Sequence, residues 1–314
     1  MTRSRHRLIA MAAIALLALL CVSAYGQDQI PELAEVPSSL PQLQRDALTK
    51  QRAALQAERD ALKARVDAHN QKLAPKGSPE EQALRAEAEQ LEAEIQKHLD
   101  ASRAFNVAVE FARRLHDAGN QYLPVTAPIT NDKSHRSAYD YAKVIDQFQV
   151  EQSERYQPGG DTYCNIFVWD VTRAMGAEIP HWVLKQYPGT SAVDTQGKLA
   201  VASSMRDELN VNATVSWLKE HGEVNGWCRV DARMAQQMAA EGHPAVAVWA
   251  NPQGGHGHVA MVRPGSVPHE TSGGPKGVAI AQAGGEPLVL DATHLTHGFN
   301  DPTLRKAIQY WYHD

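Results

Sequence analysis

The fold is decided by two stretches, Thr162-Tyr163-Cys164-Asn165-Ile166-Phe167-Val168-Trp169-Asp170 and, further along the chain, Gly257-His258-Val259-Ala260-Met261-Val262. The first passes from a polar loop into an apolar segment that predicts a buried helix, with Cys164 at the junction. The second predicts a buried strand that begins at His258. A helix N-terminus favours the charged form of a thiol, and a histidine on a facing strand can accept the thiol's proton. The two stretches therefore predict a helix packed on a sheet, with a cysteine and a histidine brought together.

Around these stretches, the sequence predicts helices first and short strands afterwards. The expected helices span 137–149, 165–175, 201–210, 212–221 and 231–240, and the expected strands span 245–250, 258–262, 278–283 and 287–292. Glycine and proline turns separate the strands, which is typical of an antiparallel meander. Residues 120–314 therefore predict one α+β domain with N-terminal helices and an antiparallel sheet, and this length suffices for a single hydrophobic core.

The segment 40–118 has the heptad spacing of a coiled coil. Its apolar seam consists of Leu48, Leu55, Leu62, Val66, Leu73, Leu84, Ala88, Leu91 and Ile95. Glycine and proline between 74 and 79 interrupt the pattern, and Ser78 with Glu81 has the spacing of a capping box that starts a second helix. We therefore expect an antiparallel α-helical coiled-coil hairpin that acts as a spacer or oligomerisation arm, or alternatively docks on a membrane or on a protein partner.

The N-terminal residues 1–26 have the pattern of a secretory signal peptide. Arg3, Arg5 and Arg7 precede an apolar run over 8–22, and small residues follow up to Gly26. Fifteen apolar residues are short for a membrane-spanning helix, although an uncleaved anchor is the alternative. We expect cleavage after Gly26, export to the periplasm or the extracellular space, and a linker over 27–39.

The charge balance of the exported chain argues against nucleic acid as a partner. Residues 1–26 hold three of the 31 lysines and arginines and none of the 36 aspartates and glutamates, so 28 basic and 36 acidic residues remain, a formal charge of −8. No basic stripe remains that could neutralise phosphates.

A third polar group is needed to orient the imidazole of His258 through its second ring nitrogen. Gln282 is the single polar side chain of the next predicted strand, and Asp291 is the alternative one strand later. His256 competes with His258 as the base, because the two share one face of the strand. His258 begins the apolar run and is the better held of the two, so we expect it to be the base.

Cys164 also has two interpretations without chemistry. It can be a small buried hydrophobe, the ordinary fate of a free cysteine, or it can form a structural disulfide with Cys228, the other cysteine left after signal cleavage. Its place at the junction of loop and helix favours the nucleophile instead. An oxyanion hole would then use the Cys164 backbone N–H, with Tyr163 and Asn165 as the nearest candidates for a second donor.

The segments Tyr163-Cys164-Asn165-Ile166-Phe167-Val168 and Gly257-His258-Val259-Ala260-Met261-Val262, followed by a polar residue on the next strand, resemble the NlpC-type and CHAP cysteine peptidoglycan hydrolases. The resemblance covers 137–293. It implies a papain-like fold and cleavage of amide bonds in peptidoglycan peptides, with no metal or cofactor. Cys164 matches the nucleophile, His258 the base and Gln282 the polar third position. The chain departs from the family in its long segment 264–276 and in having glutamine at the third position.

Two other classes of function compete with this interpretation. His256-Gly257-His258 can be half of a zinc site, as in LytM-type endopeptidases that act on the same polymer, with Asp291 or His294 as the third ligand. Those enzymes also need an upstream histidine four residues before an aspartate, and the sequence has none there. The second alternative is a non-catalytic activator or wall-binding protein that works through its coiled coil.

Overall fold

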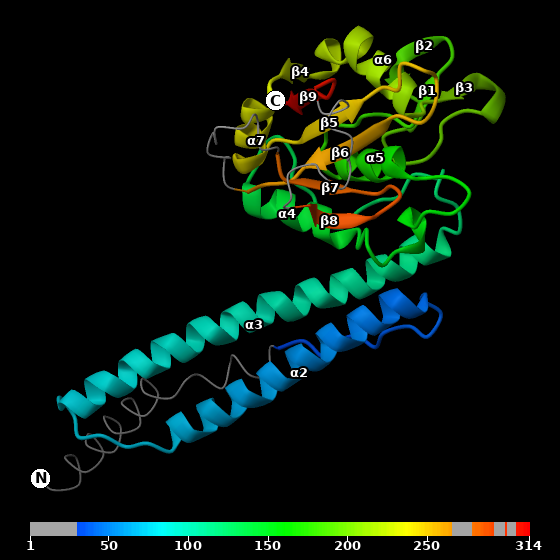
Figure 1. The fold of residues 1–314 in the computed structure, drawn as a ribbon. Coiled ribbons are helices and arrows are strands. Elements are labelled where there is room, and N and C mark those ends of the chain that lie inside the picture. The colour runs from blue at the N-terminus through cyan, green and yellow to red at the C-terminus, as the bar shows by residue number, and fades with distance from the viewer. Residues whose placement is uncertain (1–29, 266–277, 292–298, 300–305) are drawn as a thin grey trace, which may run out of the picture. The chain divides into compact units, whose positions relative to one another are not determined.

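The computed structural model describes residues 30–265, 278–291, 299 and 306–314 (Figure 1). The predicted signal peptide lies outside these residues. The chain divides into two compact units between Glu110 and Phe111, so the division falls inside a helix rather than at the predicted boundary near 118. Within the described part, no helix is long and apolar enough to cross a membrane.

The first unit contains a helical hairpin, formed by α2 (Gln42–Asn70) and the greater part of α3 (Pro79–Asp117). The two helices run antiparallel. Residues progressively later in α2 and just beyond its end contact residues progressively earlier in α3. The side-chain contacts that show this are the approach of Glu58 to His98 and the ion pairs of Arg65 with Glu94 and of Lys72 with Glu87. The predicted seam is buried except at Leu84, which is half-buried, and at Leu73, which is exposed. The inclusion of Leu73 in the seam is wrong, because α2 ends at Asn70 and its helical periodicity does not extend to Leu73.

The break between the two helices follows the predicted capping pattern. Ser78 Oγ accepts a hydrogen bond from the Glu81 N–H at 3.2 Å, and the Glu81 carboxylate accepts one from the backbone N–H of Gly77. These bonds satisfy amide groups that a helix N-terminus leaves without partners, so α3 starts where the sequence predicts.

The described part of the predicted linker packs onto this hairpin. Ile30 and Leu33 are buried, the Ala34 N–H donates to Asn106 Oδ1 at 2.7 Å, and Arg52 donates to the Ala34 carbonyl at 3.1 Å. This segment is therefore a third layer of the first unit, bonded to both helices.

The second unit combines helices with antiparallel sheets, which is compatible with the α+β class. Its larger sheet has the strand order β4-β9-β5-β6-β7-β8, and all neighbouring strands are antiparallel. The strands are β4 (Trp227–Val230), β5 (Ala245–Trp249), β6 (His258–Val262), β7 (Ile280–Gln282), β8 (Leu288–Asp291) and β9 (Gln309–His313). The helices are α4 (Ala138–Gln147), α5 (Cys164–Ala174), α6 (Val211–His221) and α7 (Ala232–Ala240).

A smaller sheet, not predicted from the sequence, has the order β2-β1-β3. Its strands are β1 (Trp182–Leu184), β2 (Tyr187–Ser191) and β3 (Arg206–Glu208). The helix predicted over 201–210 is wrong, because this segment forms a short 3₁₀ turn, Ser203–Met205, followed by β3. Most of its side chains are exposed, so it offers no apolar face that a helix would bury, and the backbone bonds to β1 instead.

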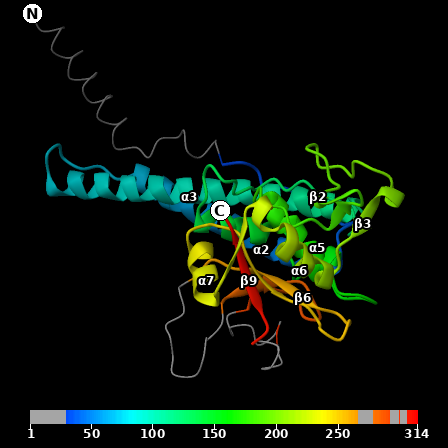
Figure 2. The same cartoon turned by 90° about the horizontal axis from the view of Figure 1, so that it is seen from above.

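The last strand, β9, lies between β4 and β5 in the larger sheet and ends beside the C-terminus (Figure 2). Trp311 is opposite Val246, and Tyr310 is opposite Ala247. Strand β9, at the C-terminal end of the described chain, thus connects β4 to β5 and so completes the larger sheet.

Helix α5 is buried on all sides, and every residue from 166 to 172 is buried. It packs against β6 and β7, which are the strands that carry the predicted histidine and glutamine (Figure 1). Its one charged buried group, Asp170, accepts a hydrogen bond from Arg155 Nε at 2.7 Å and one from the Tyr156 hydroxyl at 2.7 Å. This packing holds the first residue of α5, Cys164, beside the start of β6.

Candidate active site

Cys164 lies at the first position of α5, with its side chain buried. The backbone amides of Val259, Asn165 and Cys164 itself face the sulfur, so the sulfur meets the β6 backbone directly after His258. Burial raises the pKa of the Cys164 thiol above its ordinary value of 9.0, and the amides only partly offset this effect. Burial therefore acts on this thiol in the direction opposite to the expected effect of the helix N-terminus, which favours the thiolate. A base is needed to generate the nucleophile.

His258 is held by Gln282, the residue predicted for this role. His258 Nε2 lies 2.8 Å from Gln282 Oε1, and Gln282 Nε2 donates to the Glu286 carbonyl at 2.9 Å. A carbonyl only accepts, so the bond to Glu286 identifies the Gln282 amide nitrogen and leaves the oxygen facing the ring. His258 Nε2 must then carry the proton, which leaves Nδ1 as the acceptor of the neutral imidazole.

The surroundings of His258 keep its ring neutral and fix its orientation. Burial lowers the pKa of His258 below its ordinary value of 6.5, although the hydrogen bond to Gln282 acts in the opposite direction. The Phe299 ring meets it edge-on, with 4.9 Å between ring centroids. A Cβ at Gly284 would lie 3.2 Å from His258 Cε1, so glycine leaves space for the ring. A neutral imidazole in one tautomer is the form that accepts a proton from a thiol.

Register explains why the glutamine meets this histidine. Met261 is opposite Ala281, so the side chains of Ala260 and Gln282 share a face of the sheet. His258 lies two residues from Ala260 and therefore points to that same face. A shift of the register by one residue would turn the amide away from the ring.

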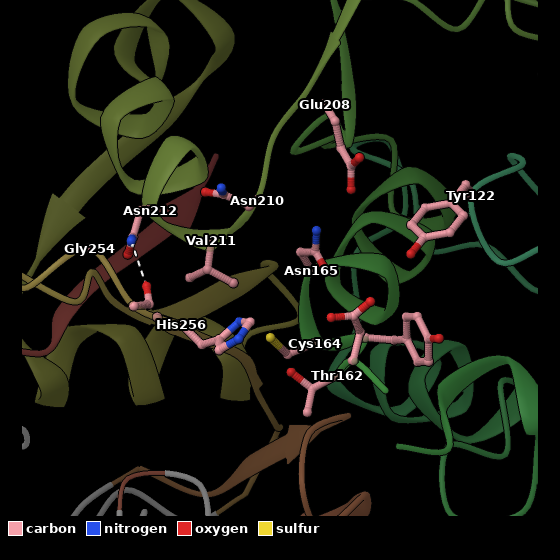
Figure 3. Close-up of a pocket in the computed structure, with 14 residues that line it drawn as sticks. Tyr122, Thr162, Cys164, Asn165, Glu208, Asn210, Val211, Asn212, Gly254 and His256 are labelled. Carbon is pink, nitrogen blue, oxygen red and sulfur yellow. Dashed lines mark hydrogen bonds between the residues drawn. The ribbon is translucent and has the colours of Figure 1, made fainter. Parts of the chain in front are cut away.

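His256, the competing base, lies in the loop before β6 and is exposed. It lines a pocket of about 400 Å³ together with Cys164, and its ring faces the sulfur side of that pocket in Figure 3. None of the described hydrogen bonds holds the His256 ring, in contrast to His258. His256 thus lines the pocket with Cys164, whereas His258, on β6, is not among the residues that line it; His258 is held by Gln282 and lies one residue before the amide that faces the sulfur.

Asn165 is not available as an oxyanion donor through its side chain. Its Nδ2 donates to the Leu209 carbonyl at 3.1 Å and lies 3.2 Å from His181 Nδ1. The remaining candidates are backbone amides of the first turn of α5, which a helix N-terminus leaves free of internal partners. Tyr163 is the residue just before α5, and its half-buried side chain lines the pocket.

The pocket wall contains residues that the sequence reasoning missed. They come from the segment before α4, from the loop before α5, and from β3 and the start of α6, and they are Tyr122, Asp161, Thr162, Glu208, Asn210, Val211 and Asn212 (Figure 3). Trp182 is not among them, although its indole N–H donates to the carbonyl of the lining residue Tyr122 at 2.9 Å. The pairing of β3 with β1 positions Glu208 in this wall, and the sequence predicts a helix for the segment that carries β3.

Two alternatives from the sequence, a disulfide between Cys164 and Cys228 and a zinc site, can be compared with the structure. Cys164 and Cys228 are both free thiols, one buried and one exposed, so the alternative disulfide between them is wrong. Among the described residues, no three histidine, cysteine, aspartate or glutamate side chains are grouped so that they could hold a metal ion. His294 lies outside those residues. Asp291 ends β8 opposite Ile280, and only its backbone is described.

The chain matches no protein-family model and no curated protein.

Proposed function

We propose that this chain is an exported cysteine hydrolase with a papain-like domain of the NlpC or CHAP type, which cleaves amide bonds in peptidoglycan peptides. The observation that carries the proposal is the bond between His258 Nε2 and Gln282, which leaves Nδ1 of a neutral imidazole as a base on the strand that the Cys164 sulfur contacts. A thiol, a base and a residue that orients the base are the groups that nucleophilic acyl transfer requires.

The reaction proceeds in two halves. His258 Nδ1 takes the thiol proton, and the Cys164 sulfur attacks the carbonyl carbon of the amide. Backbone N–H groups at the start of α5 stabilise the oxyanion of the tetrahedral intermediate. The C–N bond breaks, the amine leaves with the proton from His258, and a thioester remains on Cys164. Water, deprotonated by His258, then releases the acid and restores the thiol.

The exported location and the role of the hairpin belong to the same proposal. A signal peptide over 1–26 would deliver the chain to the cell wall, and the hairpin would act as a spacer or would bind a protein partner. The buried seam of α2 and α3 supports an ordered arm rather than a flexible tether.

The test is digestion of purified sacculi by the mature chain under reducing conditions, followed by mass analysis of the released muropeptides. Cys164→Ser should abolish the release of new free amines, since an alcohol in a site built for a thiol lacks the required nucleophilicity. Cys228→Ser is the matched control, because it removes the other free thiol, which is exposed on β4. EDTA should have no effect.

Three results would contradict the proposal. Activity of Cys164→Ser that EDTA abolishes would support the zinc endopeptidase instead. Loss of activity in Cys228→Ser but not in Cys164→Ser would place the chemistry elsewhere. Sacculi that remain intact with the reduced wild-type chain would favour the non-catalytic activator or wall-binding protein.

A further inference from the structure

The wall of the pocket opposite His256 is acidic and has no cation to neutralise it. Asp161 and Glu208 both line the pocket, and among its described lining residues none is a lysine or an arginine. In Figure 3 the Glu208 carboxylate points into the pocket above Asn165. Burial raises the pKa of the Tyr122 hydroxyl, and the charges of Tyr163, Glu208 and Asp161 raise it further, so the two carboxylates act on the same region.

The cations on or directly beside β1 and β3, the strands of the smaller sheet that pair with each other, have other partners. Arg206 donates to the Val201 carbonyl at 2.8 Å and lies over the Trp182 ring. Lys185 pairs with Asp207, the residue before Glu208, at 3.6 Å. The Glu208 carboxylate is thus left without a positive partner from its own sheet.

A buried histidine also points at Glu208 without bonding to it. His181 is buried, and its Nδ1 accepts from Asn165 Nδ2, so its proton lies on Nε2. That Nε2 makes no hydrogen bond and lies 3.5 Å from Glu208 Oε1. Burial, together with the charge of Arg155, lowers the pKa of His181 to about 3, so His181 supplies no positive charge to Glu208.

We propose that Glu208, together with Asp161 of the same pocket, binds a primary ammonium group of the substrate next to the amide that Cys164 attacks. The assignment rests on the proposed function only in treating the pocket as the substrate pocket. An ammonium has three donors, which suit two carboxylates and the surrounding amide and phenol oxygens. Burial and the charge of Asp161 raise the pKa of Glu208, and a bound cation offsets both effects. The site therefore selects substrates by a positive charge beside the scissile bond.

The ammonium can belong to a chain terminus or to a side chain, and binding experiments separate the two sources. The mature chain carrying Cys164→Ala is titrated, so that binding is measured without turnover. The probes are acetyl-Ala-Lys-Ala amide, its Nε-acetylated form, Ala-Ala-Ala amide with a free amino terminus, and acetyl-Ala-Ala-Ala amide. Binding is followed by ligand-observed NMR or calorimetry. We expect one of the two cationic peptides to bind at least about tenfold more tightly than its acetylated counterpart, as a charge-assisted hydrogen bond implies.

The matched pair of variants is Glu208→Gln and Asp207→Asn. Each removes one carboxylate from β3 while keeping the shape of the side chain, but only Glu208 lines the pocket. Glu208→Gln should abolish the preference for the cationic peptide, and Asp207→Asn should keep it. Asp161→Asn should reduce it. The assignment would be overturned if the pocket with Glu208 and Asp161 intact bound cationic and acetylated peptides equally well. It would also be overturned if the preference survived in Glu208→Gln, or if none of the four peptides bound.

The outcome is independent of the hydrolase proposal. If sacculi are not cleaved but the peptides bind with the expected preference, the pocket is an ammonium-binding site of a non-catalytic domain. If sacculi are cleaved and the preference is absent, the thiol chemistry stands and the ammonium assignment falls.

Discussion

The buried side-chain amide of Gln282 fixes the tautomer and the ring orientation of the candidate base, His258. Gln282 is almost fully buried, and its two polar atoms are used by His258 and by the Glu286 carbonyl. A glutamine has no charge, so it orients the ring without stabilising a positive imidazolium as a carboxylate would. The uncharged forms of the buried Cys164 thiol and the half-buried His258 imidazole are consistent with that choice, since burial opposes charge on both groups.

Replacement of Gln282 by leucine tests this role. Gln282→Leu removes the acceptor for His258 Nε2, which frees the ring to take either tautomer and to rotate. We expect kcat/KM on wall peptides to fall about a hundredfold, the usual effect of a small misplacement of a reacting group. Steady-state kinetics of wild type and variant would measure this.

Gln236 provides the control for Gln282. It is equally buried, and its amide bonds only to the backbone, donating to the Arg263 carbonyl at 2.9 Å and accepting from the Ala279 N–H at 2.8 Å. Gln236→Leu should lower the melting temperature about as much as Gln282→Leu but leave kcat/KM near that of wild type. Equal loss of activity in both variants would mean that Gln282 acts through stability alone.

At the scale of elements, the nucleophile helix is anchored by a buried ion pair. Arg155 Nη2 lies 3.1 Å from Asp170 Oδ1 and donates to the Leu123 carbonyl at 2.8 Å, so one guanidinium ties α5 to the segment before α4. Both side chains of the pair are almost fully buried. A buried ion pair adds little net stability, because both charges lose their hydration. It does require that the segments carrying Arg155 and Asp170 pack together, because a buried charge without its counter-ion is strongly destabilising.

Removal of the Asp170 carboxylate should therefore be costly. Asp170→Ala leaves the Arg155 guanidinium buried without its counter-ion, and we expect the free energy of unfolding to fall by about 3–5 kcal/mol. The exposed pair of Arg113 and Asp117, at 3.0 Å, is the comparison, and Asp117→Ala should cost less than about 1 kcal/mol. Urea unfolding followed by circular dichroism measures both, and similar losses in the two variants would contradict the anchoring role.

At the scale of the whole molecule, the buried His181 links folding stability to pH. The folded chain holds the pKa of His181 at about 3, whereas the unfolded chain has the ordinary value of 6.5. As the pH falls below 6.5, the unfolded state takes up a proton that the folded state does not, so stability decreases until about pH 3.

The prediction concerns how steeply the free energy of unfolding depends on pH in wild type and in two histidine variants. In His181→Gln this proton is absent, so the free energy of unfolding should decrease less steeply with falling pH than it does in wild type. The difference in slope should be up to about 1.4 kcal/mol per pH unit. His135→Gln, at an exposed histidine in the same unit, should keep the wild-type slope. Denaturant unfolding at several pH values between 6.5 and 3 measures the slopes, and parallel curves for wild type and His181→Gln would refute the assignment.

Local patterns were sufficient for a large part of this molecule. Heptads predicted the positions of α2 and α3, and apolar runs bounded by glycine predicted α5, β5 and β6 within a residue or two. Cys164, His258 and Gln282 could be selected from the sequence because each interrupts an apolar pattern at the end of a predicted element. The physical reason is that periodicity and capping are properties of neighbouring residues, which a sequence displays directly.

Long-range pairing decided the rest. The tail that forms β9 pairs with strands far away in the chain, and its own sequence does not specify which strand edge it joins. Likewise, Glu208 looks like one more surface acid until β3 pairs with β1 and brings it to His181 and the Cys164 pocket. The direction of the Cys164 pKa shift also depended on burial, which is a property of the packed core and not of the helix end alone.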